Sequence, residues 1–109
     1  MSGMNSDLPE CNVETFLKLV GGKWKAVVLY RLIDGPKRFN ELQRTITKIT
    51  QRMLTLQLRE LESDGLVHRE VYPVVPPKVE YSLTELGQTL EPLLRKIADW
   101  GSLYKELSQ

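Results

Sequence analysis

The segment from Thr50 to Leu83 constrains the fold most, because the spacing of its apolar residues changes there from that of a helix to that of two strands. On a helical wheel, residues 50–64 place four apolar side chains within an arc of about 140°. They are Met53, Leu54, Leu58 and Leu61. Gly65 ends this pattern, and the sequences of 66–72 and 78–83 predict two strands separated by a proline-rich break. The segment therefore predicts an amphipathic helix followed by a hairpin with a stiff tip.

Shorter helical patterns precede this segment, and each ends at a turn signal. They cover residues 11–20 before Gly21-Gly22, residues 23–34 before Gly35-Pro36, and residues 39–46 before a turn at 47–49. Apolar residues surround so much of the second pattern that we expect that helix to be central to the core. The third helix, the turn and the helix that Thr50 caps predict a helix-turn-helix.

A last helix is predicted from about Thr84, and its apolar stripe is longer than one small core needs. The stripe repeats every three or four residues through Leu86, Leu90, Leu93, Ile97, Trp100, Tyr104 and Leu107. The stripe forms either an interface with another chain or an unusually large part of the protomer's own core. Pro92 is expected to kink this helix or divide it in two, because proline removes one helical hydrogen bond. Together the elements predict a mainly helical α+β fold, a winged helix-turn-helix with flanking N- and C-terminal helices.

Length and composition indicate one domain. The chain has 109 residues, 41% of them apolar and 27% charged, as in an ordinary soluble globule. We expect a flexible tail at residues 1–9 and a winged-helix domain at 10–109. No apolar run approaches the roughly 20 residues that span a bilayer, and one cysteine forms no internal disulfide. We therefore expect a protein of a reducing cytoplasm with no membrane partner.

Charge is concentrated in one third of the chain. Residues 23–59 contain nine Lys or Arg against Asp34 and Glu41, although the whole chain carries only +1. Such a concentration of cations on helices followed by a hairpin is typical of proteins that bind duplex DNA. A docking domain that binds other proteins without sequence-specific DNA binding is the alternative.

The residue types needed for catalysis are not arranged for it. His68 is the sole histidine and is far in sequence from Cys11, and no glycine-rich phosphate loop or paired metal-ligand spacing is present. We therefore predict no catalytic residues, no metal and no cofactor.

The candidate DNA contacts lie mainly on the helix at 50–64. Arg52 is the best candidate for a bidentate contact with guanine, and Gln51 is a candidate for adenine. Thr55 suits a base edge or a thymine methyl, Leu56 only the methyl, and Arg59 a phosphate. The other candidates are Thr50, Lys37, Arg38 and Lys48 near the turn, and Arg69 and Lys78 on the hairpin. The alternative for each charged residue is an ordinary solvated side chain.

Short sequence blocks in a fixed order also carry a resemblance. They are Cys11-x-Val13-Glu14, Gly21-Gly22-Lys23-Trp24, Asp34-Gly35-Pro36-Lys37-Arg38-Phe39-x-Glu41-Leu42, Met53-Leu54-Thr55, Leu58-Arg59-Glu60-Leu61-Glu62, Asp64-Gly65-Leu66-Val67, Pro76-Pro77-Lys78-Val79-Glu80-Tyr81, Leu83-Thr84-Glu85-Leu86-Gly87 and Ala98-Asp99-Trp100-Gly101. In these blocks the chain resembles the HxlR-type family of bacterial winged helix-turn-helix transcription regulators, of the MarR-like superfamily. Gln51, Leu56 and Gln57 depart from the family's usual residues.

The resemblance implies a homodimer on a pseudo-palindromic operator in double-stranded DNA, nucleoid-associated when bound. It implies that the first and last helices form the interface, through Val13, Phe16, Leu17, Leu90, Leu93, Ile97, Trp100 and Tyr104. In relatives resembling this chain, the cysteine at the position of Cys11 senses a small electrophile or oxidant. The positive end of the first helix favours the thiolate there, although Glu10 and Glu14 oppose it. The alternative is a buried, inert cysteine.

Overall fold

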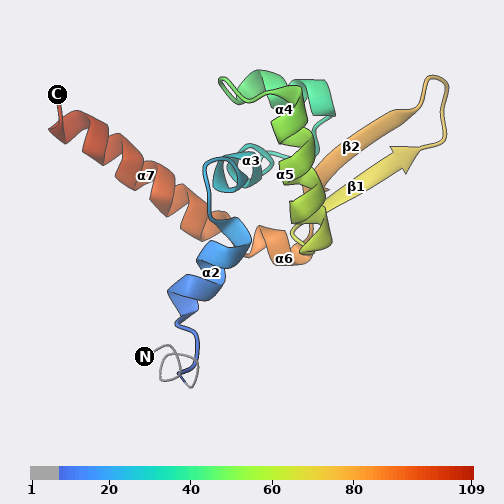
Figure 1. Ribbon diagram of the computed structural model, residues 1–109. Coiled ribbons are helices and arrows are strands. Elements are labelled where there is room, and N and C mark those ends of the chain that lie inside the picture. The colour runs from blue at the N-terminus through green and yellow to red at the C-terminus, as the bar shows by residue number, and fades with distance from the viewer. Residues whose placement is uncertain (1–7) are drawn as a thin grey trace.

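The structure, a computed structural model, describes residues 8–109. Most of the expected tail at residues 1–9 therefore lies outside the described residues. The elements in this part of the chain follow in the order α2 (Asn12–Val20), α3 (Lys25–Arg31), α4 (Phe39–Thr45), α5 (Gln51–Ser63), β1 (Val67–Tyr72), β2 (Lys78–Leu83), α6 (Glu85–Gln88) and α7 (Glu91–Leu107) (Figure 1). This order confirms the predicted helix-turn-helix followed by a two-stranded wing.

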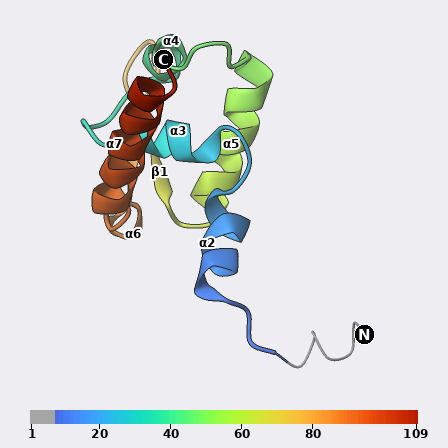
Figure 2. The same ribbon diagram turned by 90° about the vertical axis from the view of Figure 1, so that its left-hand side faces the viewer.

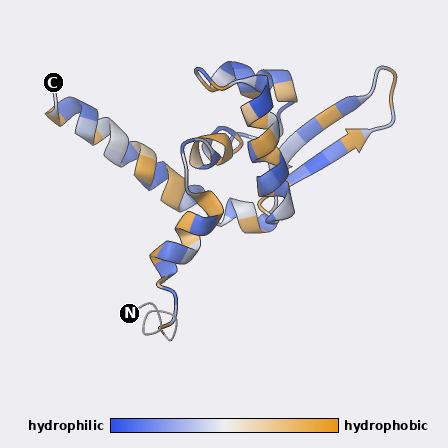
Figure 3. Ribbon diagram, viewed as in Figure 1, coloured by the Kyte–Doolittle hydropathy of each residue, from blue (hydrophilic) through white to orange (hydrophobic). Residues whose placement is uncertain are grey.

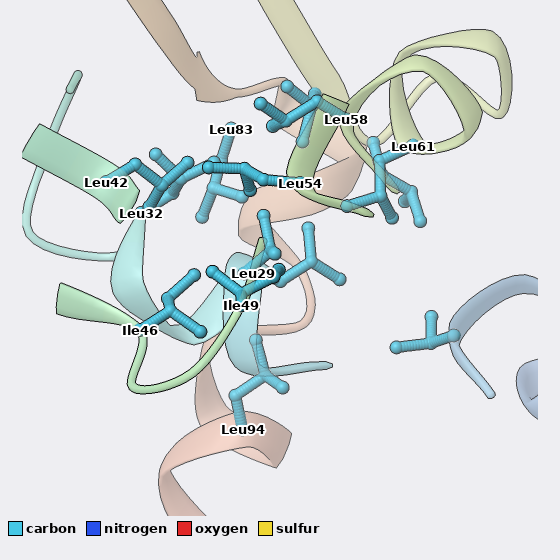
Figure 4. Close-up of a cluster of buried hydrophobic side chains, with 14 residues drawn as sticks. Leu29, Leu32, Leu42, Ile46, Ile49, Leu54, Leu58, Leu61, Leu83 and Leu94 are labelled. Atoms are coloured by element: carbon cyan, nitrogen blue, oxygen red, sulfur yellow. The ribbon is translucent and has the colours of Figure 1, made fainter. Parts of the chain in front are cut away.

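The core lies between α3, α4, α5, the base of the wing and the start of α7 (Figure 4). Its side chains are apolar throughout: Val20, Val28, Leu29, Leu32, Leu42, Ile46, Ile49, Leu54, Leu58, Leu61, Leu66, Val67, Leu83 and Leu94. Leu29 and Leu54 are fully buried, on α3 and α5. The α3 helix is therefore central, as its apolar circumference predicts, and it contacts α4, α5 and α7.

The α3 helix is shorter than the pattern at 23–34 predicts. It begins at Lys25 and ends at Arg31, and Leu32 and Ile33 continue it only as a tighter turn. In that turn the Leu32 and Ile33 N–H groups donate to the carbonyls three residues earlier, of Leu29 and Tyr30. Such three-residue spacing is a common way to end a helix. Sequence periodicity does not distinguish the two spacings.

Local hydrogen bonds fix the turn between α4 and α5. The Gln43 side-chain amide donates to the Ile49 carbonyl at 3.3 Å. The Thr50 hydroxyl accepts the Met53 N–H at 3.0 Å and caps α5 as predicted. Lys48 has φ 72°, the left-handed region in which an L-residue is uncommon. The turn thus sets the angle between α4 and α5 and leaves the Lys48 side chain exposed.

The wing is an antiparallel hairpin of β1 and β2, paired from Val67 with Leu83 out to Tyr72 with Lys78. Lys37, just before α4, forms an isolated antiparallel bridge with Tyr81 of β2, through backbone hydrogen bonds of 2.9 and 2.8 Å. The wing extends away from the body on the side opposite α7 (Figure 1). Since Lys37 is bonded to β2, the start of α4 and the wing form one framework.

Pro92 divides the last helix, as predicted. The α6 helix ends at Gln88, and α7 begins at Glu91 with proline in its first turn, where the missing N–H costs nothing. Gly87 of α6 packs so closely on Leu66, the residue before β1, that a Cβ there would lie 2.2 Å from the Leu66 carbonyl oxygen. Beyond the buried Leu94, α7 leaves the body of the protomer (Figure 1).

Candidate nucleic-acid interface

The exposed face of α5 carries the predicted base-reading residues on its N-terminal half. Gln51, Arg52 and Leu56 are exposed, and Thr55 is half-buried. They line one surface recess together with Thr50 and Arg59. The buried Leu54 and Leu58 hold the opposite face of the helix against the core. The structure therefore brings the candidates on α5 together on one side of the protomer.

One candidate differs from its predicted role. The Thr55 hydroxyl donates its hydrogen to the Gln51 carbonyl at 2.9 Å, four residues earlier in the same helix. Such back-bonding is common for threonine in helices. The hydroxyl proton is thus already used, and what Thr55 offers a base edge is its methyl group and an oxygen lone pair.

Most cations of the charged run surround α4 and α5. Within residues 8–109, the following cations near these helices form no side-chain ion pair within 4.0 Å: Lys37, Arg38, Arg44, Lys48, Arg52 and Arg59. By contrast, Lys25 is paired with Glu60 of α5 at 2.6 Å, and its side chain is only 13% exposed. Lys23 and Arg31 lie against the rings of Trp24 and Tyr30. The charge near the turn is therefore largely unneutralised.

Arg44 is a residue that the sequence reasoning did not single out. It lines one surface recess with Lys48 and another with Lys37. The signal was present in the charged run, but a helical wheel of α4 alone does not show which cations lie beside the turn. Arg44 belongs with the candidate phosphate contacts.

The two wing cations are both near carboxylates. Arg69 Nε lies 3.6 Å from Glu62 Oε2 on α5, across a cavity of about 320 Å³ between helix and wing. Lys78 Nζ lies 3.5 Å from Glu80 Oε2 and 4.8 Å from the centre of the Tyr72 ring. Neither cation is as free to meet a phosphate as those around the turn.

Apolar side chains remain exposed on α2 and α7. Both helices contain hydrophobic residues and lie away from the wing (Figure 3). Among the predicted interface residues, those exposed in the protomer are Val13, Leu17, Leu93, Ile97, Trp100 and Tyr104. Trp100 and Tyr104 stack with ring centres 5.5 Å apart. Phe16 and Leu90 instead pack partly against the core, so each serves the protomer's own fold as well. Leu103 and Leu107 extend the exposed stripe beyond the predicted set.

Cys11 is exposed and stands directly before α2, so the reading of a buried cysteine is wrong for the protomer. Its backbone N–H donates to Glu14 Oε1 at 2.9 Å. The neighbouring Glu10 carboxylate pairs with Lys18 and accepts the Thr15 hydroxyl hydrogen at 2.5 Å. These contacts, Lys18 first and Thr15 second, hold the pKa of Glu10 below its ordinary value. One of the two opposing carboxylates is thus neutralised by its own partner.

Residues 8–109 contain neither a metal-binding cluster nor a membrane-spanning helix. No group of three or more His, Cys, Asp or Glu side chains is placed there to hold a metal ion. No helix in that range is long and apolar enough to cross a bilayer.

A helix-turn-helix with a cationic recognition face and a hairpin wing defines the class of winged helix-turn-helix proteins. The family model described as HxlR-like helix-turn-helix matches residues 19–109. The chain therefore belongs to the HxlR-like helix-turn-helix family, and it is a transcriptional regulator rather than an enzyme.

Several relatives support this assignment. The chain is 64% identical over 102 residues to the HTH-type transcriptional regulator YdeP of Bacillus subtilis (strain 168). The matched region covers 94% of this chain and 80% of YdeP. It is also similar to the redox regulator HypR. The reduced form matches with a TM-score of 0.83 and 60% identity over 89% of this chain and 96% of that one. The oxidized form matches with a TM-score of 0.81 and 64% identity over 84% and 95%.

Proposed function

We propose that the protein binds a pseudo-palindromic operator as a homodimer, with α5 of each protomer in the major groove. The observation that carries this proposal is the exposed N-terminal half of α5, with unneutralised cations beside it and the carboxylates of α5 confined to its other half. A twofold axis would bring two such helices to successive major grooves, about 34 Å apart. DNA in the cytoplasm is then the principal partner.

The shape of the protomer supports the homodimer. Its radius of gyration is 16.5 Å, whereas a compact chain of this length has about 13 Å. The excess comes from α2, α7 and the wing, which all extend from the body, and α2 and α7 carry exposed apolar side chains (Figures 1 and 2). A second copy that packs against α2 and α7 would bury these side chains and leave the wing and α5 free for DNA.

Cys11 is the proposed switch. It is exposed at the start of α2, which is one of the two proposed interface helices. Two Cys11 thiols from the two protomers would form a disulfide when an oxidant such as hypochlorite takes up two electrons, giving chloride and water. An adduct with a small thiol is the other product of the same chemistry. Either product would alter the packing of α2 and hence the spacing of the two α5 helices. The similarity to a redox regulator supports this part of the proposal.

The first experiment is a titration of duplex DNA from the region upstream of the protein's own coding sequence. It compares reduced protein, mildly oxidised protein and the Cys11→Ser variant. Specific binding that oxidation changes only when Cys11 is present supports a thiol-switched regulator. Binding that ignores oxidation contradicts the switch and leaves the operator proposal standing. No specific binding to this duplex would point to a protein-docking module or to a target elsewhere.

A pair of variants tests the base-reading role of α5. Arg52→Ala is expected to lower affinity for the operator by about 1–3 kcal/mol and random-duplex affinity much less. Lys37→Ala keeps the backbone bond to Tyr81 and removes only a free cation, so it should weaken binding to every sequence and reduce the salt slope by about 1. Fluorescence anisotropy on both duplexes measures this. Equal losses on both duplexes for the two variants would remove Arg52 from base recognition.

A further inference from the structure

The cavity between α5 and the wing contains two arginines and one carboxylate. It is lined by Thr55, Leu58, Arg59, Glu62, Arg69 and Tyr81. Glu62 Oε2 lies 3.6 Å from Arg69 Nε, and Arg59 stands one helical turn before Glu62 on α5. Within residues 8–109, Arg59 has no ion pair of its own. Glu62 is thus the acidic side chain that balances this cationic cavity.

This cavity adjoins the proposed DNA face. Thr55 and Arg59 line both the cavity and the recess that contains Arg52. The other nearby carboxylate of α5, Glu60, is engaged with Lys25 of α3 and does not line the cavity. Glu62 is therefore the α5 carboxylate placed where phosphates would approach the wing.

We propose that Glu62 is a specificity-determining positioning residue, which holds Arg69 away from DNA phosphates and so suppresses non-specific binding. The proposal rests on the proposed binding of DNA through α5. Non-specific binding depends almost entirely on phosphate contacts, so an arginine engaged by Glu62 weakens it directly. On the operator, base contacts fix the position of the protein, so a freed Arg69 cannot always reach a phosphate. On random DNA the protein can shift until Arg69 meets a phosphate, so the freed side chain adds more affinity there. Specificity is the ratio of the two affinities.

The decisive variant is Glu62→Gln, which removes the charge and keeps the size of the side chain. Affinity for a random duplex should rise by about two- to fivefold, the range for a partly exposed ion pair. The salt slope on random duplex should steepen by about 0.9, the value for one added phosphate contact. The ratio of operator to random affinity should fall. A merely structural role for the ion pair would lower both affinities and would not steepen the slope.

Glu70→Gln is the matched control. Glu70 is also on the wing and its removal changes the net charge equally, but its carboxylate contacts His68 at 2.8 Å rather than Arg69. Glu70 alternates with Arg69 along β1, so the two side chains stand on opposite faces of the hairpin. Equal effects of Glu70→Gln and Glu62→Gln would overturn the proposal, because overall charge would then explain them.

Arg69→Gln completes a double-mutant cycle. Alone it should lower random-duplex affinity, because it leaves the Glu62 carboxylate without its partner where phosphates approach, whereas in the Glu62→Gln background it should abolish the gain. A gain that persists without Arg69 would overturn the proposal. The two proposals fail differently: no DNA binding by the unchanged chain contradicts the proposed function, and binding with an unaltered ratio in Glu62→Gln contradicts only the role of Glu62.

Discussion

Trp100 gives the sharpest test of the proposed dimer. The indole is 63% exposed in the protomer, on the outer part of α7. A buried tryptophan removes up to about 250 Å² from water, so the exposed share is about 160 Å², or about 4 kcal/mol at 25 cal/mol per Å². A twofold axis would bury two copies, which sets an upper limit of about 8 kcal/mol.

We expect Trp100→Ala to weaken the dimer by about 2–4 kcal/mol in total, because ordering of side chains offsets part of the transfer term. The dimer dissociation constant should then rise by about 30- to 700-fold. Sedimentation equilibrium of the reduced protein measures it, and circular dichroism at the same concentrations reports whether the helices persist. Val75→Ala is the control, because Val75 is fully exposed at the wing tip, far from α7. A dissociation constant changed less than about threefold would refute burial of Trp100 in an interface.

Two further predictions concern the fold. Gly87→Ala should lower the thermal midpoint by roughly 5–15 °C, because the added Cβ would lie 2.2 Å from the Leu66 carbonyl oxygen. Gly101→Ala is the control, because a Cβ there meets nothing within 4 Å in the protomer. Circular dichroism measures both midpoints, and equal midpoints would contradict this reasoning. Burial, opposed by the nearby Arg69 and Arg59, holds the pKa of the Tyr81 phenol above its ordinary value of 10.0. The unfolded chain therefore loses that proton first, and the free energy of unfolding should fall as the pH rises through about 10. Urea denaturation at about pH 9 and 11 measures this fall, and the free energy of unfolding should fall less between the two pH values in Tyr81→Phe than in the unchanged chain. An equal fall in both would assign the pH dependence to other groups, among them Tyr72, whose pKa is raised by its hydrogen bond to Glu80.

The sequence predicted the elements well, because periodicity and turn residues are local. The apolar arc of α5, the Thr50 cap and the division of the last helix at Pro92 all follow from residues within one or two turns of each other. The end of α3 did not follow, because a helix and its tighter last turn share the same apolar pattern. The residue range of the domain and the roles of the site residues stay predictions.

Charge in the sequence gave the region of the candidate site but not its pairings. The contact of Lys25 with Glu60 joins residues that are 35 positions apart, and only the packing of α3 on α5 brings them together. The contact of Arg69 with Glu62 likewise depends on how β1 leaves α5 after Gly65. A count of nine cations therefore overestimates the charge available for DNA, and tertiary structure decides which of them remain free.

The anchoring of α7 at a single buried side chain has a mechanical consequence. Leu94 is 2% exposed, and the helix continues from it to Leu107 with no buried residue. That arm is about 20 Å long, so a rotation of about 10° at Leu94 moves its end by about 3.5 Å, close to one base-pair step of B-DNA. In a dimer joined through α7, a small rotation of the helix at Leu94 would therefore become a large displacement at its far end. The size of the side chain at position 94 would set the angle between α7 and the body of the protomer.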